Sequence, residues 1–222
     1  MSVKKPFTVD DAYALETPGD SVCLYGEWAA TYDRDFLASS GYVVYRLVAE
    51  QLVRQKSHID GPVLDVGCGT GAVGACLREM GIREVDGIDI SEPMLAEAGG
   101  KKTMAGDSVY RKLIAADLTQ KLDLSGNHYA GLVSAGTFTH GHLGPGALDE
   151  LWRIAANGAQ CAIGIRTSHY HKAGFSGKLA ADVAVGLITE PELIEVNMYS
   201  AGGNNPEHAD DKAYIVVCQV VK

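Results

Sequence analysis

Three glycines spaced as G-x-G-x-G follow a short apolar run in the segment VLDVGCGTG, residues 63–71. Glycine lets the backbone turn tightly and lets a ligand approach the main chain closely. Gly67 and Gly69, together with Ala72, also satisfy the fingerprint of a dinucleotide-binding turn. Asp89 ends the next apolar run, at the distance expected for a carboxylate that binds ribose hydroxyls. The residues therefore predict a turn that binds a nucleoside-containing ligand.

Asp65, two positions before the first glycine, distinguishes between two such ligands. A dinucleotide places its pyrophosphate against this turn and the following helix N-terminus, where a carboxylate would repel it. S-adenosylmethionine has no phosphate but carries an ammonium and a sulfonium, which a carboxylate attracts directly or through water. The charge of Asp65 therefore favours S-adenosylmethionine, with helix capping as the alternative role of this residue.

Two pairs of histidines form a second group of candidate functional residues. His140 and His142 follow one predicted strand, and His169 and His171 follow the next. Both pairs would lie at the carboxyl edge of a parallel sheet, where ligands bind. Because imidazole titrates near neutral pH, His140 is predicted to act as a base on the substrate. Metal binding and plain loop roles are the alternatives, but no nearby carboxylate completes a metal site and no metal is predicted.

Seven short apolar runs predict the strands that position these residues. They are Pro62–Val66, Glu84–Ile90, Tyr110–Ala116, Gly131–Ala135, Gln160–Arg166, Leu193–Tyr199 and Ala213–Val221. Helical stretches separate the early strands, which implies a parallel sheet with helices on both faces. Only a loop precedes the last run, so it is predicted to enter antiparallel. The predicted fold class is a Rossmann-like, doubly wound, seven-stranded and mostly parallel α/β sheet.

Capping residues mark the predicted helices between these strands. The helices are Ala72–Met80, Glu92–Ala98 and Leu148–Ala156. Ser91 stands at an N-cap position. Glycines stand where left-handed C-caps are expected, at Gly81, Gly99 and Gly158.

Aromatic residues crowd the helical spacing of the first 60 residues. They are Tyr25, Trp28, Tyr32, Tyr42 and Tyr45. This pattern predicts an N-terminal helical cap over residues 1–60, with helices at Leu24–Ala30 and Gly41–Gln55, on an α/β core of residues 61–222 in one domain. The aromatic side chains either pack on the sheet or face the ligand as a lid.

Composition excludes several other classes of protein. The 222 residues suit a single domain, and a net charge of −9 is opposite to that of a protein that grips nucleic acid. No apolar stretch reaches the ~20 residues of a membrane span. The five cysteines are scattered and never spaced as CxxC, which is typical of a reduced, cytoplasmic protein. The predicted partner is a small-molecule substrate rather than nucleic acid or a membrane, and the sequence leaves the oligomeric state open.

The motifs VLDVGCGTG, VDGIDIS, SEPML and AADL occur in an order that resembles the class I S-adenosylmethionine-dependent methyltransferases. The resemblance covers roughly residues 22–221. It implies that Asp89 holds the ribose, Ile90 lies beside the adenine, and Asp117 accepts a hydrogen bond from the adenine amino group. Leu118 then offers its backbone N–H.

A narrower resemblance lies in LYGEWAATYDRDF, GTFTHGHLGP and LDELWRI, which are similar to the methyltransferase-like proteins named after the Williams–Beuren syndrome region. It implies that aromatic residues of the cap contact the cofactor. The predicted cofactor-binding residues are Tyr25, Trp28, Tyr32, Asp65, Gly67, Cys68, Gly69, Gly71, Asp89, Ile90, Met94, Asp117, Leu118 and Ala135.

The resemblance implies methyl transfer from S-adenosyl-L-methionine to a small-molecule nucleophile. The sequence at residues 135–138 is Ala-Gly-Thr-Phe rather than the [ND]-P-P-[YF] of many enzymes that methylate nucleobase or amide nitrogen, so this subset is disfavoured. Two alternatives keep the cofactor. One is other chemistry with the sulfonium, such as intramolecular cyclisation, and the other is a non-catalytic S-adenosylmethionine-binding partner protein.

Overall fold

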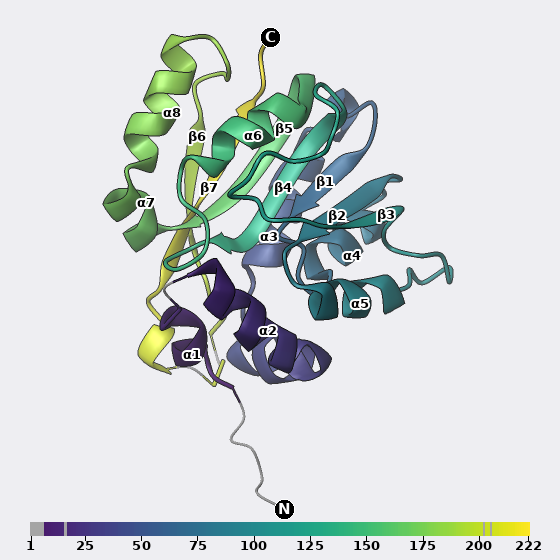
Figure 1. Cartoon of the computed structure of the whole chain (residues 1–222), viewed down its shortest axis with the longest axis vertical. Helices are drawn as coiled ribbons and strands as arrows, with labels where there is room; N and C mark the ends of the chain where they lie inside the picture. The colour runs from purple at the N-terminus through teal and green to yellow at the C-terminus, as the bar shows by residue number, and fades with distance from the viewer. Residues whose placement is uncertain (1–6, 16, 202, 205) are drawn as a thin grey trace, which may run out of the picture.

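A seven-stranded sheet of order β3-β2-β1-β4-β5-β7-β6 forms the centre of the computed structural model, which describes residues 7–15, 17–201, 203–204 and 206–222 (Figure 1). The strands are β1 (Val63–Val66), β2 (Val85–Asp89), β3 (Lys112–Ala115), β4 (Tyr129–Phe138), β5 (Ala155–Arg166), β6 (Glu192–Asn197) and β7 (Lys212–Gln219). Strands β1 to β5 pair in parallel, and β7 lies antiparallel between β5 and β6. The predicted fold class, including the antiparallel last strand, is confirmed.

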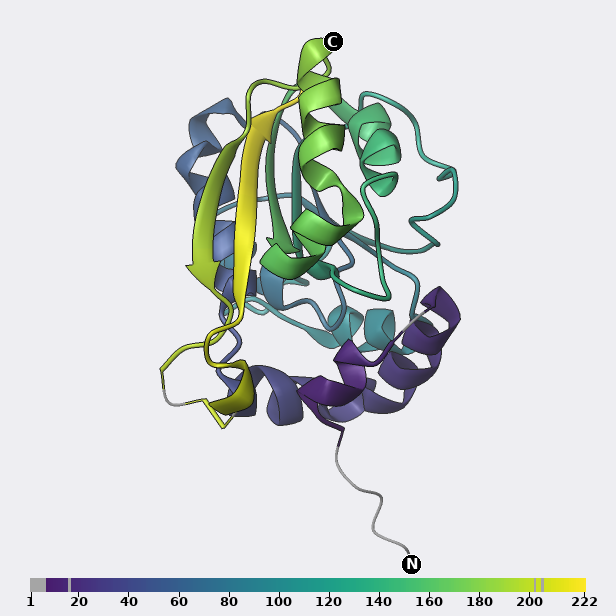
Figure 2. The ribbon, with the colours of Figure 1, turned by 90° about the vertical axis from the view of Figure 1, so that its left-hand side faces the viewer.

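Helices cover both faces of the sheet. One face carries α3 (Val44–Arg54), α4 (Ala72–Glu79) and α5 (Glu92–Gly100). The other face carries α6 (Ala147–Ile154), α7 (Thr167–Ala173) and α8 (Phe175–Ala184). Figure 2 shows α7 and α8 in front of the sheet on this second face. Apolar side chains alternate along the strands, so each face has its own buried cluster.

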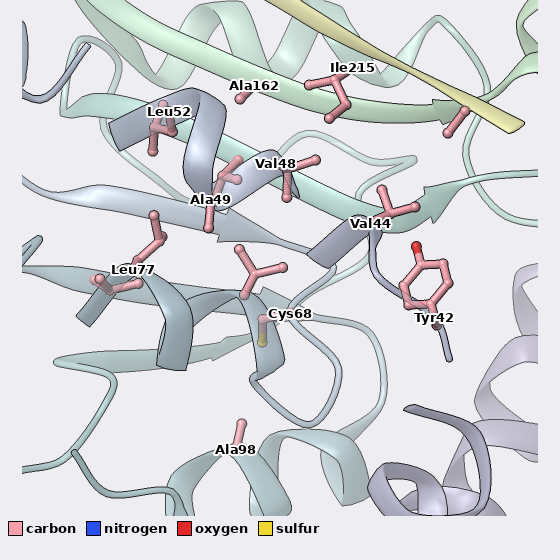
Figure 3. Close-up of a cluster of buried hydrophobic side chains, with 14 of the residues drawn as sticks. Tyr42, Val44, Val48, Ala49, Leu52, Cys68, Leu77, Ala98, Ala162 and Ile215 are labelled. Carbon is pink, nitrogen blue, oxygen red and sulfur yellow. The ribbon is translucent and has the colours of Figure 1, made fainter. Parts of the chain in front are cut away.

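Helix α3 belongs to the core of the fold. Val44, Val48 and Ala49 on one side of the helix are buried between α3 and the strands (Figure 3). Gly164 in β5 permits this close packing, because a Cβ there would lie 3.1 Å from Val44 Cγ1. The part of the first 60 residues that lies beyond the strand ends is therefore shorter than the predicted cap.

That shorter segment contains α1 (Val9–Tyr13), α2 (Pro18–Tyr32) and the π-helix η1 (Asp33–Ala38), and it is called the cap below. Figure 1 shows it below the carboxyl ends of the strands. Thr17 and Asp20 form a capping box that starts α2. Residues 1–6 and 16 of the predicted cap lie outside the described residues.

Two helices and two cap positions differ from the sequence-based prediction. Helices α7 and α8 were not predicted, because histidines, a β-branched start and glycines weaken their helical pattern. Gly99, a predicted C-cap, lies inside α5, which continues to Gly100 and ends where Lys101 turns extended. Ser91 caps α5 as predicted. Gly81 follows α4 with the predicted left-handed backbone. Gly158 is also left-handed, but it lies within β5 because α6 already ends at Ile154, so its predicted C-cap role is wrong.

Two short 3-10 turns, η2 (Lys56–His58) and η3 (Pro206–His208), complete the regular structure. The backbone of Tyr42, which follows the cap, forms an antiparallel bridge with Tyr199, which follows β6. This bridge connects the chain after the cap to the edge strand of the sheet. Within the described part of the chain, no helix has the length and apolar character needed to cross a membrane.

Candidate active site

A cavity lies between the cap and the carboxyl ends of β1 to β4. Most of the predicted cofactor-binding residues line it. They are Tyr25, Tyr32, Gly67, Cys68, Gly69, Asp89, Ile90, Met94, Asp117, Leu118 and Ala135. Loops from separate strands thus converge on one site, as expected at the edge of a parallel sheet where ligands bind.

Asp89 forms the best-defined polar group of the cavity floor. Its Oδ2 accepts a hydrogen bond of 2.8 Å from the N–H of Gly69, and its Oδ1 accepts one of 2.9 Å from the N–H of Ser91. Burial raises the pKa of Asp89, while these backbone donors act in the opposite direction. The carboxylate is thereby held in one orientation beside the glycine loop, with lone pairs left to accept hydroxyl protons.

The glycine loop presents bare backbone to the cavity. Gly69 has a φ of 52°, and a Cβ added there would meet nothing within 4 Å, so it would occupy space left to a ligand. Gly67 has a different requirement, because its φ is 66° and a Cβ would lie 2.0 Å from Thr137 Oγ1. One glycine therefore makes room for the ligand and the other for the neighbouring strand.

The charges around the cavity fit a cationic nucleoside. Among the described residues, its only charged lining groups are Asp89 and Asp117, and neither lysine nor arginine contributes. A pyrophosphate would find two carboxylates and no cation there. S-adenosylmethionine would bring a sulfonium and an ammonium, which these acids favour. The donor set and the uncovered glycine backbone thus fit this cofactor.

Asp117 is fixed by a turn after β3. Its Oδ1 accepts hydrogen bonds from the backbone N–H and the hydroxyl of Thr119, at 2.8 and 2.7 Å. This arrangement leaves the other carboxylate oxygen for a ligand, beside the backbone of Leu118. The geometry is compatible with the adenine contacts that the sequence resemblance implies.

Asp65 does not line the cavity, in contrast to its predicted contact with the cofactor. The side chain is completely buried, and its Oδ2 accepts hydrogen bonds from the Gly74 N–H at 3.0 Å and the Tyr110 hydroxyl at 2.6 Å. Its Oδ1 is buried without a hydrogen-bond partner. Asp65 thus binds the first turn of α4, which is the capping role that the sequence left as the alternative.

Trp28 and Gly71 also lie outside the cavity lining, although both were predicted to bind the cofactor. Trp28 is 1% exposed and packs edge-on against Tyr32 and Phe36, so it serves as the core of the cap. Gly71 precedes α4 with a φ of 92°, and a Cβ there would lie 2.8 Å from the ring of Tyr110. Close packing at the start of α4 therefore accounts for this glycine.

Of the four candidate histidines, His142 alone lines the cavity. His140 is exposed and outside the cavity lining, whereas His142 lines the cavity. His169 Nε2 lies 2.9 Å from the carbonyl oxygen of Leu143, and His171 packs its exposed ring beside Tyr214. Within the described chain, no three His, Cys, Asp or Glu side chains are grouped as a metal site.

Several cavity residues were missed by the sequence analysis. Phe36 and Leu37 come from the π-helix, and Met198 and Tyr199 follow β6. Tyr42 and Tyr45 belong to the aromatic pattern for which a lid facing the ligand was one alternative, but they were not among the predicted cofactor-binding residues. Helical aromatic spacing was the available signal for the cap residues, whereas the position of Tyr199 depends on its long-range bridge to Tyr42.

Comparison with known proteins agrees with the geometry. Residues 63–158 match the model of a family described as a methyltransferase domain. Methyltransferase-like protein 27 of Homo sapiens is 28% identical over 156 residues, which cover 68% of this chain and 60% of that protein. The match thus spans less than two thirds of the length of this human relative.

Solved structures share the fold at low sequence identity. The magnesium protoporphyrin IX methyltransferase of Synechocystis, solved with bound S-adenosylmethionine, has a TM-score of 0.56 and 19% identity, covering 81% of this chain and 78% of that chain. The [4+2]-cyclase SpnF has a TM-score of 0.66 and 15% identity, covering 93% and 98%. The family match assigns residues 63–158 to a methyltransferase domain, and the solved structures show that the chain has the fold of class I S-adenosylmethionine-dependent methyltransferases. The predicted class of enzyme and its cofactor are confirmed.

Proposed function

We propose that the protein transfers a methyl group from S-adenosylmethionine to a small molecule bound under the cap. The observation that carries this proposal is one continuous cavity, which joins the glycine loop and Asp89 to an aromatic compartment formed by the cap and Tyr199. When bound, the cofactor would supply an activated methyl group. The protein then has to align a nucleophile with that group and exclude water.

Asp89→Ala should weaken the binding of S-adenosylhomocysteine by about 10- to 100-fold. The variant removes a charged acceptor of ribose hydroxyls, and the loss of such a hydrogen bond costs about 1.5–3 kcal/mol. Isothermal titration calorimetry of the wild type and the variant measures this change. Asp107→Ala, which changes an exposed carboxylate outside the cavity, is the control. Tight binding of NAD by the wild type, without binding of S-adenosylhomocysteine, would refute the proposed cofactor site.

The cap is proposed to act as a gate, because direct contacts connect it to the glycine loop and to the end of α5. Asp33 in η1 accepts a hydrogen bond of 2.5 Å from the Thr70 hydroxyl and forms an ion pair with Lys101, which follows α5. A small molecule can reach the enclosed aromatic compartment once these contacts open.

Amide hydrogen exchange of residues 17–38 should therefore slow markedly when S-adenosylhomocysteine binds, while exchange in α8 should not change. Mass spectrometry of peptides with and without this ligand measures the difference. Equal protection of the cap in both states would show that its aromatic residues belong to the permanent core.

Cyclisation is a second candidate function because of one specific observation. The [4+2]-cyclase SpnF shares the fold over 93% of this chain with a TM-score of 0.66. A non-catalytic S-adenosylmethionine-binding role is also compatible with the cofactor residues. Formation of S-adenosylhomocysteine in equal amounts with a methylated product distinguishes methyl transfer from both alternatives.

A cytoplasmic location and a small-molecule partner complete the proposal. The five cysteines are free thiols, including the buried pair Cys161 and Cys218, which lie opposite each other on β5 and β7. Free thiols at paired strand positions support a reducing compartment. The net charge of −9 disfavours nucleic acid as the substrate.

A further inference from the structure

The half of the cavity nearest the cap is lined mainly by aromatic rings. We define the tyrosine compartment as Tyr25, Tyr32, Phe36, Tyr42, Tyr45 and Tyr199. Burial raises the pKa of the Tyr25, Tyr32 and Tyr42 hydroxyls, so these groups stay protonated and uncharged. None of its members carries a fixed charge. The compartment therefore favours a flat, apolar and uncharged ring over an ion.

His142 lies beside this compartment, and its hydrogen-bond partners favour one tautomer of the ring. Its Nδ1 lies 3.1 Å from the backbone carbonyl oxygen of His140, which can only accept a hydrogen bond. Nδ1 also lies 3.2 Å from Thr139 Oγ1, which can accept or donate. We assign the proton of the neutral ring to Nδ1, because this tautomer satisfies both neighbouring oxygens. Nε2 is then an acceptor, and it receives a hydrogen bond of 3.2 Å from the Tyr25 hydroxyl. A lone pair of His142 thus already binds a phenolic hydroxyl in the cavity.

The surroundings of His142 keep the ring uncharged. Burial is the largest of the effects that lower the pKa of His142. The neighbouring imidazoles of His169 on α7 and of His140 also lower this pKa, whereas the hydrogen bond to the His140 carbonyl raises it. Tyr25 on α2 faces Nε2 as a neutral donor. A neutral imidazole is the form that can take up a proton from a substrate.

Given the proposed methyl transfer, on which this inference rests, we propose that the tyrosine compartment binds an uncharged aromatic compound with a phenolic hydroxyl. His142 Nε2 is the base that deprotonates this hydroxyl. The substrate hydroxyl takes the place of the Tyr25 hydroxyl on Nε2. As the phenolic oxygen bonds to the methyl carbon, the carbon–sulfur bond breaks and its electron pair stays on the sulfur. The hydroxyl proton moves to Nε2, and His142 later releases it to solvent.

Other nucleophiles fit the compartment less well. An aromatic carboxylate would find no lysine or arginine among the described lining residues. An alkylammonium group would lose its hydration on binding, and no member of the tyrosine compartment is a carboxylate that could compensate for this loss. The rings offer only cation–π contacts. A neutral phenol needs an acceptor for its proton, which is what Nε2 provides.

Binding tests the substrate class independently of turnover. With the protein saturated by S-adenosylhomocysteine, calorimetry with 2-naphthol, 2-naphthoate and 2-naphthylmethylammonium should show the tightest binding for 2-naphthol. His142→Ala should weaken 2-naphthol binding about tenfold, the scale of one lost neutral hydrogen bond. Preferred binding of the carboxylate or the ammonium compound would overturn the inference. Failure of S-adenosylhomocysteine itself to bind would instead refute the proposed function.

Turnover with 2-naphthol and labelled S-adenosylmethionine tests the base. His142→Ala should lower kcat by about 10²–10⁴-fold, the usual share of a general base, while S-adenosylhomocysteine affinity stays unchanged. His142→Gln keeps a hydrogen-bond acceptor but cannot take the proton, so it should preserve naphthol binding and still lose turnover.

The pH profile separates a base from a merely structural residue. In the wild type, kcat should fall on the acid side with a pKa below that of free imidazole, because burial lowers the pKa of His142. In His142→Gln this limb should disappear, and kcat should rise with pH as 2-naphthol ionises. His140→Ala is the discriminating variant, since it removes an exposed ring but keeps the backbone carbonyl. Loss of turnover in His140→Ala, with normal turnover in His142→Ala, would overturn the assignment.

Discussion

The wild-type protein should lose stability between about pH 4 and pH 7, and Asp65→Asn should abolish a large part of that loss. The Asp65 carboxyl is completely buried, and burial raises its pKa to about 7 against the opposing effect of hydrogen bonds from Tyr110 and Gly74. In the unfolded chain an aspartate has a pKa near ~3.9. The folded protein therefore binds this proton more tightly than the unfolded chain does.

The sign of the pH dependence follows from that difference. The stabilisation is fully present below about pH 3.9 and is lost as pH rises through about 7, because ionisation places an unpaired charge in the core. At ~1.4 kcal/mol per pKa unit, a difference of about three units corresponds to roughly 4 kcal/mol in the free energy of unfolding. An asparagine keeps the oxygen that accepts from Gly74 and Tyr110 but cannot ionise.

Urea unfolding of both proteins at intervals from pH 4 to pH 8 measures this effect. The difference between the two curves cancels the other titrating groups. Tyr110→Phe is a second variant, because it removes a hydrogen bond that lowers the pKa of Asp65. The loss of stability in that variant should move to higher pH. Parallel curves for the wild type and Asp65→Asn would contradict a buried, proton-binding Asp65.

The orientation of the Asp65 side chain could not be predicted from the glycine motif. The glycine spacing correctly predicted a ligand-binding turn, but it did not specify where the preceding carboxylate points. Side chains alternate along a strand, and Asp65 shares the face of Val63, which packs in the cluster of α3 and α4. The carboxylate is thus directed under α4, toward the N–H of Gly74. Strand alternation, applied to β1, was the signal that favoured the capping role.

The histidine loop illustrates a second limit. Sequence spacing places His140 and His142 in one loop, but only the backbone path determines which ring enters the cavity. Gly141 between them has a φ of 79°, so the chain reverses locally and turns His142 inward. The same limit applies to Tyr199, which reaches the cavity through pairing with a residue 157 positions away. The strands and the helices other than α7 and α8 were predictable because local periodicity indicates them, whereas these contacts depend on tertiary packing.

Gly141→Ala should separate the cap from the histidine loop and lower methyl transfer by on the order of 10²-fold. A Cβ at this position would lie 1.9 Å from the backbone carbonyl oxygen of Leu15, far inside any real contact. The left-handed backbone of Gly141 adds strain for alanine. Since the obstructing atom belongs to the main chain, a side-chain rotation cannot relieve the overlap. Misplacement of a catalytic group by 1 Å is enough to cost ~10²-fold in rate.

Gly144→Ala is the matched control, because a Cβ at that nearby glycine meets nothing within 4 Å and no left-handed backbone is required. Turnover of 2-naphthol and hydrogen exchange of residues 8–15 should change in Gly141→Ala and stay at wild-type values in Gly144→Ala. Affinity for S-adenosylhomocysteine should change much less, because Asp89 and Gly69 lie on separate loops of the core. Normal turnover in Gly141→Ala would show that the contact between Leu15 and this loop is not needed to hold His142 in the cavity.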